Sequence, residues 1–95
     1  MILVKMHKDG VLALCDENLV GKKIEHDLLQ LDVTERFYKG EEKSKEEILT
    51  LAEDAATINI VGEEAVKFAI DNKIVDEGQI IYIGDVPHAQ VFKIQ

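Results

Sequence analysis

The sequence is poor in aromatic residues, cysteine and proline, and it has no tryptophan. Phe, Tyr and Trp make up only 5% of its 95 residues, so a core must come mainly from Ile, Leu, Val and Ala. The single cysteine, Cys15, excludes an intramolecular disulfide and favours a reducing interior, so we expect a cytoplasmic protein. No apolar run approaches the roughly 20 residues that span a bilayer, so no membrane partner is expected. Lys5 interrupts the first apolar run, so no signal peptide is predicted.

Positive charge is also scarce, since 11 Lys and Arg residues stand against 19 Asp and Glu residues for a net charge of −8. Nucleic-acid affinity depends on clustered Lys and Arg. This balance therefore gives RNA no support as a partner, although it is compatible with a small basic patch. Solubility is its simplest consequence. An apolar content of 46% over 95 residues is sufficient for one domain, residues 1–95.

The segment from Ile2 to Cys15 predicts a β-hairpin with its turn at Lys8-Asp9-Gly10. A two-residue loop would mix polar and apolar side chains on both faces. A three-residue loop, with Gly10 in the left-handed conformation, pairs His7 with Val11 and separates the two kinds better. In that register one face carries Ile2, Val4, Met6, Leu12 and Leu14. We expect that face to be core and His7, on the other face, to point toward solvent.

Turn and cap signals divide the middle of the chain. Asp16 is expected to cap a helical turn ending at Gly21, and Leu29, Leu31 and Val33 alternate as in a half-buried strand. An extended piece over residues 22–25 and another capped turn over residues 34–40 flank that strand. Ser44 and Glu47 form a capping box, which predicts the start of an amphipathic surface helix.

The second half of the chain predicts strand, helix, strand and hairpin. Residues 57–61 are β-branched, Gly62 opens a helix, and residues 79–83 form the next strand of a right-handed βαβ crossover. A final hairpin, residues 80–94, turns at Gly84-Asp85-Val86-Pro87. The predicted fold is α+β with two layers: one mixed sheet of five or six strands and two main helices packed on one face.

Catalytic chemistry has little support in this sequence. A nucleophile at Cys15 would need His7 or His88 nearby, and the expected register puts Cys15 opposite Leu3 instead. The spacing of Cys15, His7, His26 and His88 is not that of a zinc motif. Adjacent carboxylates such as Glu46-Glu47 point about 100° apart on a helix and do not converge. We predict no catalytic residue, no metal site and no cofactor.

Two segments are candidates for a binding surface. His88 and Gln90 share one face of the last strand, and Asp85 is close enough in sequence to reach back to His88 and fix its tautomer. The second segment, Arg36-Phe37-Tyr38-Lys39, is where basic and aromatic residues interleave. Phe37 is expected in the core with Tyr38 at its edge. The candidate binding residues are therefore Asp85, His88, Gln90, Arg36, Tyr38 and Lys39.

Four segments, in this order, resemble the archaeal domain-of-unknown-function family 424: Cys15-Asp16-Glu17, residues 34–40 (TERFYKG), Ile60-Val61-Gly62-Glu63 and residues 84–91 (GDVPHAQV). The resemblance covers essentially the whole chain, and Pro87-His88-Ala89-Gln90 is its most specific part. It implies an archaeal cytosolic protein with a compact two-layer α/β arrangement. It implies no established activity, catalytic residues or cofactor.

Three hypotheses for function follow. The first is a non-enzymatic binding or adaptor module, associated with the translation machinery, with a protein or RNA partner. The second is a small enzyme or metal-binding protein that uses Cys15, His7 and His88. The third is a homo-oligomer that pairs through an exposed sheet face at Val11, Ala13 and Val91.

Overall fold

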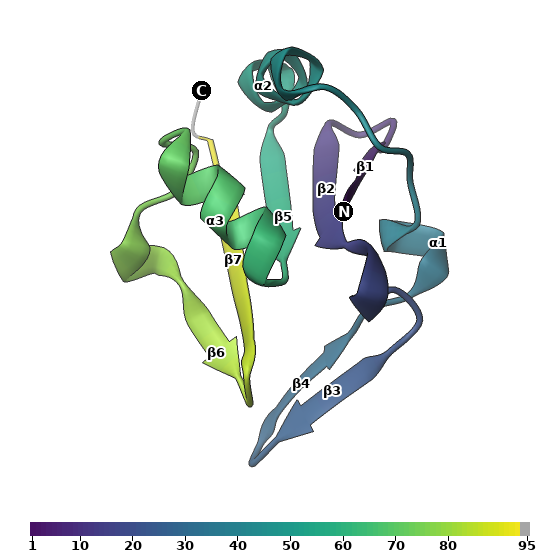
Figure 1. Ribbon diagram of the computed structural model, residues 1–95, viewed down its shortest axis with the longest axis vertical. Helices are drawn as coiled ribbons and strands as arrows, with labels where there is room; N and C mark the ends of the chain where they lie inside the picture. The colour runs from purple at the N-terminus through teal and green to yellow at the C-terminus, as the bar shows by residue number, and fades with distance from the viewer. Residues whose placement is uncertain (94–95) are drawn as a thin grey trace.

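The computed structural model describes residues 1–93 and contains one mixed five-stranded sheet (Figure 1). Its strands run β1-β2-β5-β7-β6 across the sheet, where β2 and β5 are parallel and the other neighbours antiparallel. Their bounds are β1 Ile2–Met6, β2 Val11–Asp16, β5 Thr57–Val61, β6 Ile81–Ile83 and β7 Val86–Phe92.

Three α-helices and a small second sheet complete the fold. The helices are α1 Glu35–Tyr38, α2 Lys45–Asp54 and α3 Glu63–Asp71, and the second sheet pairs β3 Lys23–His26 with β4 Leu29–Asp32. Single 3₁₀ turns occupy Glu17–Leu19 and Glu77–Gln79. The α+β class, the mixed sheet and the two main helices, α2 and α3, confirm the fold prediction. No helix of residues 1–93 is long and apolar enough to cross a membrane.

The β1–β2 hairpin has the predicted register. Val4 lies opposite Leu14, Leu3 lies opposite Cys15, and the backbone N–H of His7 donates to the Val11 carbonyl at 2.8 Å. Gly10 has φ +84°, the left-handed conformation that a three-residue loop requires. The capping box at Ser44 and Glu47 is also present, with both reciprocal hydrogen bonds at 3.1 Å.

Both faces of the sheet carry apolar clusters. One face packs against α2 and α3 and holds the larger core, which includes Leu12, Leu14 and Ile60. Residues of β2 that alternate with these, Ala13 and Cys15, face the other way and pack with a smaller buried cluster. The members of that smaller core are Ala13, Cys15, Val33, Tyr38 and Val61, covered by α1 and by the β3–β4 hairpin. The sequence predicted only the first of these layers.

The predicted β-α-β connection from β5 through α3 to β6 is present, but in a split form. β5 and β6 do run parallel, but they do not pair, because β7 is inserted between them and is antiparallel to both. The final hairpin does form, with Ile83 opposite Val86 and with Gly84 at φ +62°. Because β7 lies between the two strands, Ala89 pairs with Ile60, and both residues belong to the larger core. Ile94, the predicted end of this hairpin, lies outside the described residues.

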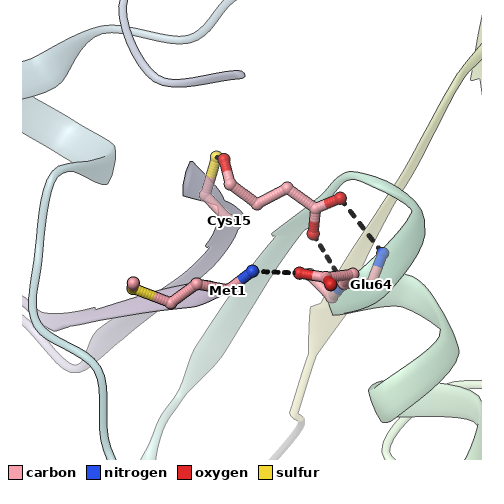
Figure 2. Close-up of polar contacts among 5 residues, drawn as sticks. Met1, Cys15 and Glu64 are labelled. Atoms are coloured by element: carbon pink, nitrogen blue, oxygen red, sulfur yellow. Dashed lines mark hydrogen bonds and ion pairs between the residues drawn. The ribbon is translucent and has the colours of Figure 1, made fainter. Parts of the chain in front are cut away.

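Asp16 has a different role from the one predicted. Its side chain does not cap the turn that follows it. Its two carboxylate oxygens instead accept hydrogen bonds from the backbone N–H groups of Glu64, at 3.0 Å, and Ala65, at 2.8 Å, at the start of α3 (Figure 2). The N-terminal amine of Met1 contacts the Glu64 side chain beside this cap. Asp16 therefore ties the end of the central strand β2 to the helix.

Gly62 makes the approach of Asp16 to the helix possible. Its φ of +107° is rarely adopted by residues with side chains, and an added Cβ would lie 2.3 Å from Cγ of Asp16. The N-terminus of α3 has no side-chain cap of its own, so the carboxylate from β2 satisfies backbone donors that would otherwise be left without partners.

We predict that Asp16→Ala lowers the free energy of unfolding by about 1–3 kcal/mol, because two backbone donors of α3 lose a charged acceptor in a buried place. Urea denaturation followed by circular dichroism measures the change. The neighbouring exposed residue supplies the control, since Glu17→Ala should shift stability by less than about 0.5 kcal/mol. Equal effects of the two substitutions would contradict the role assigned to Asp16.

Candidate binding surface

Helix α1 forms where its sequence begins with a cap and ends before a glycine. The Thr34 hydroxyl accepts from the backbone N–H of Phe37 at 3.2 Å, which satisfies one free donor of the first turn. The helix ends at Tyr38, and Gly40 follows the extended residue Lys39. A single turn this short has little stability of its own, so its position depends on packing against the sheet.

Packing places the two aromatic residues of α1 in different surroundings. Tyr38 is buried in the smaller core, where burial raises the pKa of its hydroxyl to about 12. Phe37 is half-buried and stacks on His7, with ring centroids 4.5 Å apart and planes 20° apart. This reverses the prediction that Phe37 is core with Tyr38 at its edge. It also corrects the expectation for His7, which is half-buried under Phe37 rather than facing solvent.

His7 and Lys5 of the β1 segment hold α1 through its carbonyl groups. Nε2 of His7 lies 3.0 Å from the carbonyl oxygen of Phe37, and because that oxygen can only accept, Nε2 carries a hydrogen. Nζ of Lys5 donates to the carbonyl oxygen of Arg36. The charge of Lys5 is favourable near the last carbonyls of a helix. The two side chains therefore fix where Arg36 and Phe37 stand.

An open surface pocket of about 310 Å³ lies here, which we call the basic–aromatic pocket and which is lined by Lys5, His7, Thr34, Arg36 and Phe37. No carboxylate of residues 1–93 lines it, although acidic residues outnumber basic ones in the chain. The adjacent Glu35 pairs with Lys39, with 3.5 Å between the charged atoms. Arg36 is exposed, and its guanidinium makes no ion pair or hydrogen bond within residues 1–93. The pocket therefore carries an unpaired positive charge at Arg36.

A larger open groove of about 900 Å³ lies beside β1, where the residues after α1 meet α2. Glu41 pairs with Val4 at this edge through two backbone hydrogen bonds, of 2.8 and 3.0 Å. Lys39, one of the predicted binding residues, lines this groove rather than the basic–aromatic pocket. Three lysines and three glutamates line the groove together, which gives it no preference for either sign of charge: Lys5, Lys39, Lys43, Glu41, Glu46 and Glu47.

His88 does not join the exposed surface for which it was a candidate. It is 9% exposed, and its Nδ1 lies 2.9 Å from the Ile60 carbonyl oxygen, which fixes the tautomer that Asp85 was expected to fix. Asp85 is exposed in the β6–β7 turn. Since β7 is three strands from β1, His88 stands roughly 14 Å across the sheet from the strand that carries Lys5. The structure does not bring His88 together with Arg36 and Lys39.

Gln90 is exposed on the same sheet face as His88 and donates from Nε2 to Oδ1 of Asn59 at 2.7 Å. Of the six predicted binding residues, Arg36 alone lines the basic–aromatic pocket, while Tyr38 and His88 are buried. Lys5 and His7 were missed. The signal for them was present, because both occupy the polar face of the predicted hairpin, two positions apart.

The structure separates the three residues of the enzyme hypothesis. Val61 of β5 lies between Cys15 and His88, which puts two strand spacings, roughly 10 Å, between their positions. Cys15 lies opposite Leu3, four residues or roughly 13 Å along the strand direction from His7. Within residues 1–93 no group of three or more His, Cys, Asp or Glu side chains is arranged to hold a metal ion.

The surface proposed for a homo-oligomer is also rearranged. Ala13 is fully buried in the smaller core, and Val91 packs against the larger core on the opposite face of the sheet from Val11. These three residues therefore form no common exposed face. Self-association itself stays a prediction, which a measurement of molar mass by light scattering would test.

Cys15 is predicted to be chemically inert in the folded protein. Burial, helped by the charge of Asp16, raises the pKa of its thiol from 9.0 to about 12, so almost no thiolate exists at pH 8. We expect alkylation by iodoacetamide at pH 8 to be at least about 100-fold slower than in urea-unfolded chain, because the thiolate is the reactive form. The same protein in urea is the control, and native alkylation at the unfolded rate would contradict the assignment.

Comparison with known proteins agrees with this fold. The family model described as "Protein of unknown function (DUF424)" matches residues 5–94. A crystal structure of an uncharacterized conserved protein from Methanopyrus kandleri is similar, with 33% sequence identity and a TM-score of 0.75, over 96% of this chain and 90% of that chain. A search of curated proteins found no match to this chain. The match over nearly all residues confirms the resemblance seen in the sequence: the chain belongs to the DUF424 family of proteins of unknown function.

Proposed function

We infer that the chain is a non-enzymatic binding module whose contact surface is the basic–aromatic pocket and whose partner bears phosphate groups. The observation that carries this is the charge of the pocket. Lys5, His7 and Arg36 line it without any carboxylate, in a chain of net charge −8. A pocket that has basic but no acidic side chains, in a chain that is acidic as a whole, favours the binding of an anion.

The donors of the pocket fit a phosphate group in particular. Lys5 uses one N–H on the Arg36 carbonyl and keeps two others, and the Thr34 hydroxyl accepts from Phe37 and keeps its own O–H to donate. The free guanidinium of Arg36 can present two parallel N–H groups to phosphate oxygens. The backbone carbonyls that hold Lys5 and His7 fix these donors in advance, which lowers the cost of ordering them on binding.

We also propose where this binding takes place. Association with the translation machinery in the archaeal cytoplasm is the finer form of the proposal, since ribosomal RNA offers a dense array of phosphates. We expect the protein to co-sediment with purified archaeal ribosomes and Arg36→Glu to abolish this. Co-sedimentation that is absent, or unchanged by Arg36→Glu, would contradict the association but not the pocket.

The pocket itself is tested with an abasic octamer, a labelled sugar–phosphate chain without bases. Between 100 and 300 mM salt, fluorescence anisotropy should give a slope of log K against log salt of about −1.4, the value for two phosphate contacts on a single strand. Arg36→Ala should reduce the slope to about −0.7 and weaken binding. In that range the Debye length is below about 10 Å, so carboxylates across the sheet are largely screened.

Lys22→Ala is the matched control, because Lys22 is exposed and outside the pocket, and its loss changes the net charge equally. It should leave both affinity and slope unchanged. An affinity equal for Arg36→Ala and the wild type, or no binding at 100 mM salt, would overturn the proposed function.

A further inference from the structure

Part of the sheet face that carries α1 is open. Helix α1 covers the β1–β2 side of this face, and the β3–β4 hairpin covers the end that carries Cys15, Val61 and β6. One row of this face runs from His7 to Val11, Thr57 and Phe92, on β2, β5 and β7. The three paired residues are half-buried or exposed. His7 also lines the basic–aromatic pocket, so the row leads from the pocket onto the open surface.

The strand residues whose side chains lie on this face include no Asp or Glu. The next row holds Lys5, Ala13, Asn59 and Gln90, and the row after it Leu3, Cys15, Val61, His88 and Ile81. None of these residues is acidic. The helices α2 and α3, which carry many of the carboxylates, pack on the opposite face. The strand residues of this face therefore add no negative charge to the pocket, although Glu46 and Glu47 of α2 share the larger groove with Lys5.

Asn59, which is 8% exposed, and Gln90, which is exposed, carry unused hydrogen-bonding groups on this face. Gln90 Nε2 donates to Asn59 Oδ1 at 2.7 Å, and within the described residues the amide N–H₂ of Asn59 and the amide oxygen of Gln90 make no other bond. The amide N–H₂ of Asn59 is not fully shut off from solvent without a partner, and Gln90 is itself exposed. A free donor thus stands beside a free acceptor, which matches the Watson–Crick edge of uracil, where N3–H donates and O4 accepts.

Phe92 supplies the flat apolar surface next to these amides. It lies two residues after Gln90 on the same face, it is 67% exposed, and it belongs to neither core. Exposed aromatic rings on a sheet are the platforms on which proteins stack unpaired bases.

We propose that single-stranded RNA crosses this open face, with a phosphate in the basic–aromatic pocket and a base stacked on Phe92 beside the Asn59–Gln90 amides. The inference rests on the proposed function, because the pocket supplies the charge that binds the chain of phosphates. Three strand spacings, roughly 14 Å, separate β1 from β7, so a short oligonucleotide can reach both places.

Two labelled oligomers of equal length separate this inference from the proposed function: octauridylate and the abasic octamer. The wild-type protein should bind octauridylate about tenfold more tightly, because a stacked base adds affinity that phosphates alone do not give. Phe92→Ala should remove this difference while binding to the abasic octamer is unchanged, and Phe92→Tyr should keep it.

Tyr82→Ala is the matched control, because Tyr82 is 62% exposed and lies opposite Pro87 on the other face of the sheet. It should change neither affinity. Equal binding of the two oligomers by the wild type would overturn the RNA inference and leave the proposed function standing, as would a preference for octauridylate that survives Phe92→Ala. Binding of neither oligomer would overturn both.

Discussion

The contact between α1 and the strand β2 is the interaction on which the smaller core and the basic–aromatic pocket depend. Ala13 and Cys15 are small and fully buried, and Tyr38 packs with them in the smaller core. A four-residue helix cannot persist without such packing. With Tyr38 buried there, Phe37 stacks on His7, and the carbonyl groups of Arg36 and Phe37 bond to Lys5 and His7. The pocket is a consequence of this packing.

Local signals in the sequence were enough to predict what forms locally. The register of the first hairpin follows from Gly10 and from the separation of polar and apolar residues, and it is confirmed pair by pair. The capping box at Ser44 and Glu47 marked the start of α2 correctly. In each case the residues that decide the structure lie within a few positions of one another, so their spacing is visible in the sequence.

Contacts between distant segments could not be predicted in the same way. Asp16 is a residue type that commonly caps the helical turn that follows it, yet it caps a helix 48 residues later. It can do so because Gly62 lets the start of that helix approach its side chain. The insertion of β7 between β5 and β6 is equally invisible to periodicity. The sequence did contain a signal of the smaller core. β2 reads Val-Leu-Ala-Leu-Cys, a continuous apolar run typical of a strand buried on both faces.

Net charge was the least informative property, because it does not say where charges stand. The carboxylates of α3 lie on the side of the sheet opposite the pocket, roughly 10 Å away, whereas Glu46 and Glu47 of α2 share the larger groove with Lys5. At physiological salt the Debye length is about 8 Å, so the effect of the α3 carboxylates on an anion bound at Arg36 is weak compared with direct contact. Electrostatic affinity for phosphate is set by the groups it touches. A net charge of −8 therefore lowers the rate at which a polyanion arrives from a distance more than it opposes the contact once made.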